Sequence, residues 1–161
     1  MPFQTDCALL HESRNSHRQV SRSTGRAESA FGGQGLVAGA VREPRHAAAM
    51  ETRALNLEGR TTLKELAHIY RRASIVVTPD SGPLHIAAAV GTPVVALFGA
   101  SEPARTGPYG RIHTVVRSDL PCSPCFRKTC ETRQCMKDIT VEAVFAAVRK
   151  YTPGEENVSR R

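Results

Sequence analysis

The segment that most constrains this chain is residues 78–99, which read TPDSGPLHIAAAVGTPVVALFG. A β-branched run at 75–77 leads into it, and such runs form strands buried on both faces of a parallel sheet. A helix start, a stretch of small residues, a Gly-Thr-Pro break and a second apolar run at 94–98 follow in order. Gly and then Pro after a helical stretch are typical of a helix end. The segment therefore predicts a strand, a short helix and a second, parallel strand.

Four residues around the start of that helix are candidates for binding a ligand. Ser81 is a good N-cap, Gly82 lets a ligand approach the backbone, and His85 can add a hydrogen bond or a proton from the same turn. First-turn N–H groups and the positive end of the helix dipole together favour a phosphate. Asp80 ends the preceding strand, and ligands of parallel sheets bind outside such strand ends. The alternative is structural: Asp80 and Ser81 only cap the helix, and His85 serves the fold.

Regular patterns flank this unit on both sides. A short strand is predicted at 55–57, and Thr62 with Glu65 forms a capping box that opens a helix. A further strand is predicted at 112–116, and Thr140 caps a last helix. The first helix has an apolar face of Leu63, Leu66, Ala67, Tyr70 and Ala73, and the last has one of Val141, Val144, Phe145 and Val148.

The two ends of the chain lack such patterns. The first fifty residues are rich in Ser, Arg and Gly and show no sustained helix or strand period, so we expect residues 1–50 to be poorly ordered and to pack little. The polar tail 152–161 is expected to be flexible. No apolar run is long enough for a signal peptide or a membrane span, which predicts a cytoplasmic protein. The folded domain is therefore expected at 54–151.

The charge is strongly basic, with 22 Lys and Arg against 15 Asp and Glu, a net charge of +7. Only 5% of residues are aromatic, and no motif of a nucleic-acid-binding module is present, so nucleic acid is not an expected partner. The simpler interpretation is a solvated basic face.

Four cysteines form a C-x2-C-x4-C-x4-C cluster: Cys122, Cys125, Cys130 and Cys135. They are close enough in sequence to surround one tetrahedral metal ion, which makes a structural zinc site one interpretation. The spacing lacks the long gap of zinc ribbons and differs from iron–sulfur spacings. The other interpretation is a loop of reduced thiols over the surface of the domain, since stable disulfides are rare in the cytosol.

A wider set of motifs points to a known family. The string DSGPLHIAAAVGTPVVALFG at 80–99 is followed by Glu-Pro at 102–103, TGPYG at 106–110 and CSPC at 122–125. Across 54–151 the chain resembles the C-terminal half of glycosyltransferase family 9, the bacterial ADP-heptose:lipopolysaccharide heptosyltransferases. The resemblance implies an α/β fold with a Rossmann-like parallel sheet, as a partial C-terminal domain of a GT-B glycosyltransferase. In such enzymes that domain holds the donor nucleotide.

The resemblance also implies a function: inverting transfer of heptose from ADP-heptose to the inner core of lipopolysaccharide, without a catalytic metal. Ser81, Gly82 and His85 match positions that serve the ADP pyrophosphate, and Asp80 matches one that holds hydroxyls of the transferred sugar. No catalytic residue is identified, because the family's base lies mainly in the N-terminal domain. The family's donor-clamping lysine loop is not recognisable either. Peripheral contact with the inner face of the inner membrane is expected.

The length sets the remaining expectation. A chain of 161 residues is too short for two Rossmann-like domains, so we expect a donor-binding portion that is inactive alone. A truncated or frame-shifted reading frame would explain why residues 1–50 do not match the family. The alternative from another class is a non-catalytic module, either one that binds an ADP-sugar or one that binds a metal through the cysteines.

Overall fold

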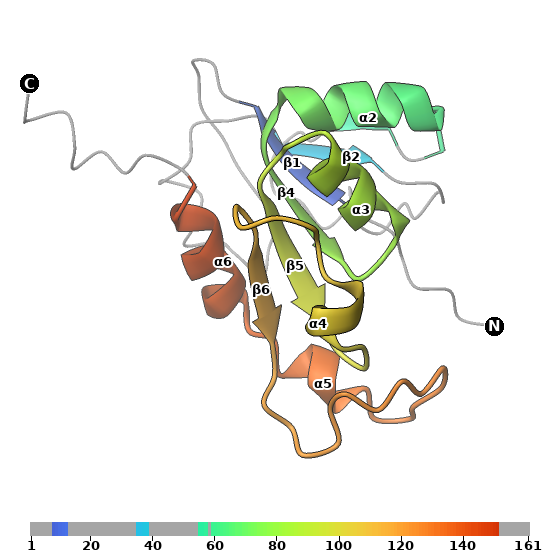
Figure 1. Cartoon of the computed structure of the whole chain (residues 1–161), viewed down its shortest axis with the longest axis vertical. Helices are drawn as coiled ribbons and strands as arrows, with labels where there is room; N and C mark the ends of the chain where they lie inside the picture. The colour runs from blue at the N-terminus through green and yellow to red at the C-terminus, as the bar shows by residue number, and fades with distance from the viewer. Residues whose placement is uncertain (1–7, 13–34, 39–54, 58, 152–161) are drawn as a thin grey trace, which may run out of the picture.

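The computed structural model describes residues 8–12, 35–38, 55–57 and 59–151, which form an α/β fold (Figure 1). Within this part of the chain, six strands make one sheet in the order β3-β2-β1-β4-β5-β6. The strands are β1 (Ala8–Glu12), β2 (Gly35–Ala38), β3 (Leu55–Asn56), β4 (Ala73–Pro79), β5 (Val94–Phe98) and β6 (Thr114–Arg117). The helices are α2 (Leu63–Arg72), α3 (Gly82–Ala89), α4 (Pro103–Thr106), α5 (Gln134–Lys137) and α6 (Val141–Arg149).

The predicted strand–helix–strand unit is confirmed as β4, α3 and β5. β4 pairs in parallel with β5, and β5 pairs in parallel with β6. Val76 and Val94 face each other across the first pair, and both are fully buried. Gly91 has a φ of +81° just after α3, the left-handed conformation that suits glycine at a helix end. The parallel half of the sheet thus follows the sequence pattern closely.

The expectation that residues 1–50 pack little is wrong for two short segments. β1 lies between β2 and β4 and runs antiparallel to both, with Leu10 opposite Leu36 on one side and Val76 on the other. β2 and β3 are parallel to each other and run in the direction of β4, so β1 is the antiparallel exception in an otherwise parallel sheet. β1 reads ALLHE and β2 reads GLVA, and neither has the β-branched run that marks β4, so the sequence did not single them out as strands. The rest of 1–54 and the tail 152–161 lie outside the described residues.

Two hydrophobic clusters lie on opposite faces of the sheet, because successive strand residues point to opposite sides. One cluster joins Val94, Ala96 and Phe98 of β5 to buried residues of α2 and α3. The other joins Ile75 and Val95 to Ala147 of α6. The molecule therefore has three layers, with α2 and α3 over one face and α6 over the other (Figure 1).

The helix starts agree with the sequence patterns. In the capping box of α2, Thr62 Oγ1 accepts from the Glu65 N–H at 3.3 Å, and the Glu65 carboxylate accepts from the Thr62 N–H at 2.7 Å. The hydrogen bonds that the Glu65 carboxylate accepts from the N–H and the hydroxyl of Thr62 lower the pKa of Glu65. Thr140 caps α6 in the same way, accepting from the Ala143 N–H. Leu63 is an exception to the predicted apolar face of α2, since it is 71% exposed. None of the helices among the described residues is both long and apolar enough to cross a membrane.

Candidate functional site

The candidate residues gather at one edge of the sheet, where the parallel strands β4, β5 and β6 end. Asp80 and Ser81 follow β4, while Gly99 and Ala100 follow β5. The Asp80 N–H donates to the carbonyl of Leu97 at 3.2 Å, which ties the end of β4 to β5. This edge carries α4, α5 and the cysteine loop (Figure 1). The structure thus places the candidate residues outside the carboxyl ends of parallel strands, where ligands of such sheets bind.

The start of α3 differs in one respect from the prediction for Ser81. Ser81 occupies the N-cap position but makes no side-chain cap hydrogen bond. Its hydroxyl instead donates to the carbonyl of Pro79 at 3.3 Å and lies 3.4 Å from the hydroxyl of Thr78. These groups at the end of β4 bind the Ser81 hydroxyl in place of the first-turn N–H groups of α3. The Ser81 side chain therefore satisfies none of the N–H groups in the first turn of α3.

Backbone donors in this turn can be assigned individually. Pro83 has no N–H, and the N–H of Leu84 donates to the carbonyl of Ser81 at 3.2 Å. The N–H of Gly82 has no acceptor among the described residues. Fewer first-turn N–H groups are thus free than the four at a regular helix start. The N–H of Gly82 is the free donor nearest the N-terminal end of α3.

Gly82 lies beside open space. A Cβ atom built on Gly82 would have no heavy atom within 4 Å, and its backbone is not in the left-handed region. Neither packing nor conformation therefore requires glycine here. Open space in front of a free N–H at the positive end of an eight-residue helix is suited to an anionic ligand.

His85 projects from the same turn and is exposed, next to the fully buried Leu84. Its ring nitrogens form no hydrogen bond with another described residue. Its exposure argues against the structural interpretation, in which a histidine is satisfied inside the core. The side chain is free to approach a ligand at the helix start.

Asp80 is held by the first residue of the TGPYG string, to which the sequence alone assigned no role. Thr106 Oγ1 donates to Asp80 Oδ2 at 2.9 Å, across 26 residues of sequence. Asp80 is therefore oriented by α4 rather than by capping α3. No local signal could have found this pair, because it depends on how the loop after β5 folds back.

The cysteine loop packs on the end of β5. The Ser123 hydroxyl donates to the carbonyl of Gly99 at 2.6 Å, and the N–H groups of Cys125 and Phe126 donate to the carbonyl of Ala100 at 3.0 and 2.8 Å. A Cβ at Gly99 would lie 3.2 Å from Cys135 Sγ and 2.6 Å from a side-chain atom of the next residue. The loop is thus anchored at the same edge as the candidate site.

The thiols of Cys122, Cys125, Cys130 and Cys135 are free. In the part of the chain that the structure describes, no three His, Cys, Asp or Glu side chains are grouped so that they could hold a metal ion. The hydroxyl of Thr132 lowers the pKa of the exposed Cys130 thiol, whereas burial raises that of Cys135. The zinc interpretation therefore gains no geometric support and stays an alternative that a measurement must test.

We expect protein purified without added metal to contain neither zinc nor iron in stoichiometric amount, because the thiols are not grouped around a common centre. Elemental analysis together with thiol titration of the native protein measures this. Stoichiometric zinc that is lost in Cys130→Ser would show that the loop rearranges around a metal.

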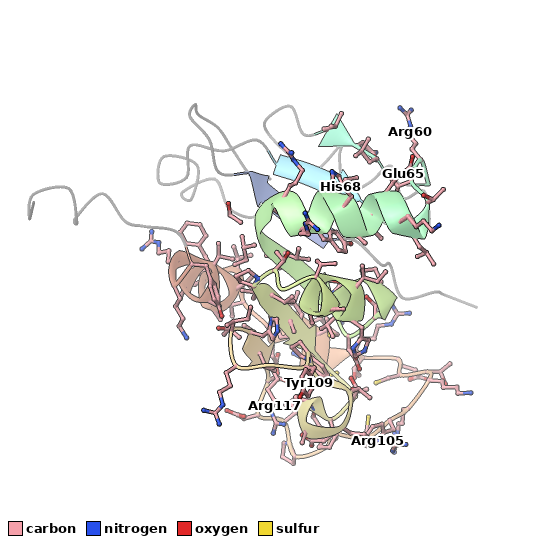
Figure 2. All side chains as sticks on the ribbon, turned by 45° about the horizontal axis from the view of Figure 1, so that its top comes forward. Arg60, Glu65, His68, Arg105, Tyr109 and Arg117 are labelled. Atoms are coloured by element: carbon pink, nitrogen blue, oxygen red, sulfur yellow. The ribbon has the colours of Figure 1, made fainter. Side chains whose placement is uncertain are left out.

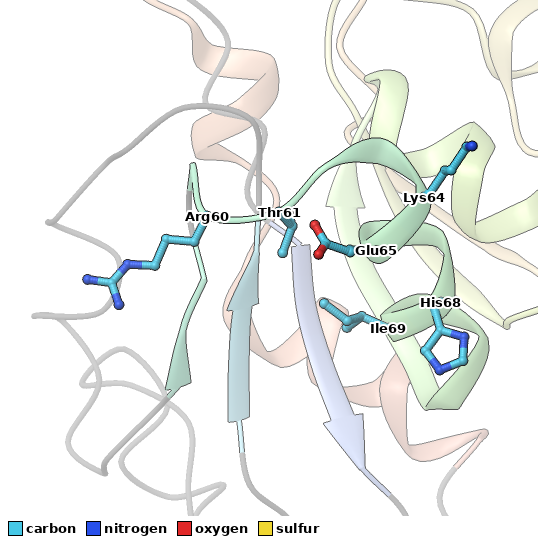
Figure 3. Close-up of a pocket in the computed structure, with 6 residues that line it drawn as sticks. All are labelled: Arg60, Thr61, Lys64, Glu65, His68 and Ile69. Carbon is cyan, nitrogen blue, oxygen red and sulfur yellow. The ribbon is translucent and has the colours of Figure 1, made fainter.

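A shallow pocket of about 430 Å³ lies on the far side of the molecule, along α2 (Figure 3). None of the candidate residues lines it, and the carboxylate of Glu65 there is already bonded to Thr62. Its position away from the strand ends makes it a poor alternative for the site. The residues that line it are Arg60, Thr61, Lys64, Glu65, His68 and Ile69.

The sequence of this chain matches a known protein family. The family model described as glycosyltransferase family 9 (heptosyltransferase) matches residues 33–136. The chain belongs to glycosyltransferase family 9. The match spans β2 to α5 and includes all four candidate residues and the cysteine loop. It begins before residue 54, where we expected the resemblance to start.

Two relatives of this chain are named as heptosyltransferases. Lipooligosaccharide heptosyltransferase 2 of Campylobacter jejuni is 36% identical over 100 residues, which are 60% of this chain and 32% of that protein. Lipopolysaccharide heptosyltransferase 1 of Pseudomonas aeruginosa is 42% identical over 71 residues, 44% of this chain and 20% of that protein. This family 9 chain thus spans about a third or less of the length of these relatives.

Solved structures agree with the fold. The family 9 glycosyltransferase of Veillonella parvula matches with a TM-score of 0.57 and 28% identity, over 67% of this chain and 32% of that one. The ADP-heptose lipopolysaccharide heptosyltransferase II of Escherichia coli matches with a TM-score of 0.50 and 27% identity, over 68% of this chain and 30% of that one. The Rossmann-like α/β architecture predicted from the sequence is confirmed.

Proposed function

We propose that this chain is the donor-binding portion of a heptosyltransferase that transfers heptose from ADP-heptose to the inner core of lipopolysaccharide. The observation that carries the proposal is the open start of α3 at Gly82, at the carboxyl end of a parallel sheet in a family 9 chain. The names of the relatives and of the Escherichia coli structure support the choice of donor and acceptor.

The chemistry assigned to α3 concerns the leaving group. When the bond between the sugar and ADP breaks, negative charge grows on the pyrophosphate. The N–H of Gly82, the dipole of α3 and a hydrogen bond from His85 would stabilise that charge more strongly in the transition state than in the ground state. In this proposal the protein itself supplies the positive field, and the transfer requires no metal cofactor.

Asp80 is assigned to the transferred sugar. A carboxylate accepts hydrogen bonds from sugar hydroxyls, and Asp80 lies immediately before the turn that would hold the pyrophosphate. No residue of this chain is assigned as the base that deprotonates the acceptor. In the proposal that base comes from the part of the family fold that this chain does not span, so we expect no transfer by this chain alone.

The partners and location follow from the same proposal. An acceptor anchored in the inner membrane would be met at its cytoplasmic face, and a net charge of +7 favours an anionic surface. We therefore place the protein in the cytoplasm, with peripheral contact to that membrane and without nucleic acid as a partner.

Titration calorimetry of the chain with ADP tests the site, and replacing His85 by alanine should weaken binding by about 1–3 kcal/mol, as for the loss of a hydrogen bond to a charged group. The affinity of the unmodified chain is expected to be weak, because the lysine loop of the family is not recognisable. His85 is exposed, so its removal should leave the stability of the fold unchanged.

The matched control is His68→Ala, which removes another exposed histidine from α2, at the opposite end of the molecule from α4 (Figure 2). His68→Ala should bind ADP like the unmodified chain. If it weakens binding and His85→Ala does not, the nucleotide occupies the pocket beside α2. If millimolar ADP does not bind at all, the proposed function is wrong.

A further inference from the structure

α4 connects three parts of the sheet edge. Its N-cap residue Glu102 accepts from the Ala104 N–H at 3.4 Å and pairs with Arg117 of β6 at 3.6 Å. On the helix itself, the guanidinium of Arg105 lies over the ring of Phe126 in the cysteine loop, 5.5 Å from its centroid. Arg105 and Arg117 lie in the same region of the molecule, around α4 (Figure 2). This one-turn helix is therefore fixed from both β6 and the cysteine loop.

The helix ends on the residue that contacts Asp80. After Thr106, the N–H of Gly107 donates back to the carbonyl of Pro103 at 2.8 Å. A Cβ at Gly107 would clash with that carbonyl oxygen, so the close turn requires glycine. The position of Thr106 is thus set by tight backbone geometry as well as by the contacts of α4.

The hydroxyl of Thr106 has two acceptors in reach but one proton. Asp80 Oδ2 lies at 2.9 Å and the carbonyl of Glu102 at 3.3 Å. The shorter contact is to a charged oxygen, and charge-assisted hydrogen bonds are the stronger ones, so the proton goes to Asp80. Asp80 Oδ1 has no hydrogen bond to another described residue and remains able to accept one from a ligand.

We propose that Thr106 is a positioning residue, which holds the carboxylate of Asp80 ready to accept a hydroxyl of the transferred sugar. This inference rests on the proposed function, because it needs the sugar of the donor beside Asp80. Without the threonine hydroxyl, the carboxylate must be ordered at the moment of binding, which weakens the contact. The effect concerns the sugar and not the nucleotide.

The test compares the affinities of the full chain for ADP-heptose and for ADP. In Thr106→Val, which keeps the shape and removes the hydroxyl, affinity for ADP-heptose should fall about tenfold, comparable to the loss of one charge-assisted hydrogen bond, while affinity for ADP stays unchanged. Thr106→Ser retains a hydroxyl and should restore the affinity for ADP-heptose. In an Asp80→Ala background, Thr106→Val should cause no further loss.

Each outcome is decisive. Equal weakening of both ligands, or a fall in unfolding midpoint that accounts for the loss, would show a merely structural role for Thr106. Unchanged binding of ADP-heptose, or an equal loss in the Asp80→Ala background, would also overturn the inference. If Thr106→Val does not fold, Thr106→Ala replaces it in the same comparison. An unmodified chain that binds ADP but gains nothing from the sugar overturns the inference alone, whereas one that binds neither overturns the proposed function as well.

Discussion

Replacing Gly82 by valine should abolish nucleotide binding and leave the fold intact. A Cβ at this position meets nothing within 4 Å, so the added side chain fits the protein without strain. It would, however, fill the space through which a pyrophosphate reaches the Gly82 N–H. Because glycine is itself costly in a helix, the free energy of unfolding should change by no more than about 1 kcal/mol. Calorimetry with ADP and denaturant unfolding measure the two effects separately.

Two other variants are controls for Gly82→Val. Gly82→Ala adds only one methyl group and should bind ADP with an affinity between those of the unmodified chain and Gly82→Val. Gly91→Ala should do the reverse, lowering stability through its φ of +81° without touching the binding site. If Gly82→Val retains full affinity, the nucleotide binds elsewhere. If it unfolds, the glycine has a structural role that the open space does not reveal.

Replacing Leu84 by alanine should cost about 2–5 kcal/mol of stability, the range for a leucine removed from a packed core. Leu84 is completely buried and packs in the cluster that joins α2, α3 and β5. Such a loss is a large fraction of the stability of an ordinary domain. Chemical denaturation, monitored by circular dichroism, measures it.

The control makes the same chemical change at an exposed site. Leu63→Ala, on α2, removes a leucine that is 71% exposed and should change stability by no more than about 0.5 kcal/mol. Leu84 lies in the first turn of α3, which carries the candidate site. ADP affinity should therefore fall together with stability in Leu84→Ala. Equal stability losses in the two variants would contradict the packing described for α3.

Local signals in the sequence were enough for the central unit. The β-branched run before Asp80, Pro83 in the first helical turn and the glycine at position 91 act on their immediate neighbours, so their effects can be read without knowing the fold. The capping box of α2 and the N-cap of α6 are local for the same reason. The identity of the family followed from the ordered string of motifs, which the family match confirms.

Contacts between distant residues were decided by the tertiary structure. The pairing of β1 with β4 joins residues more than sixty positions apart, and nothing in the sequence of β1 predicts it. Ser81 is a good N-cap by type, yet carbonyl and hydroxyl groups at the end of β4 take its side chain. The exposure of Leu63 likewise depends on where the other layers end.

The sequence by itself determined the strand–helix–strand unit, the residues at its helix start and the family, because each is encoded in neighbouring residues or their order. The tertiary structure decided which of those residues face open space and which are held by others. Gly82 is open, Asp80 is bound to Thr106, and the four cysteines are not gathered around one centre. The physical reason is that burial, free donors and ligand geometry depend on the folding back of the loops after β5 and β6, whose contacts are not encoded locally.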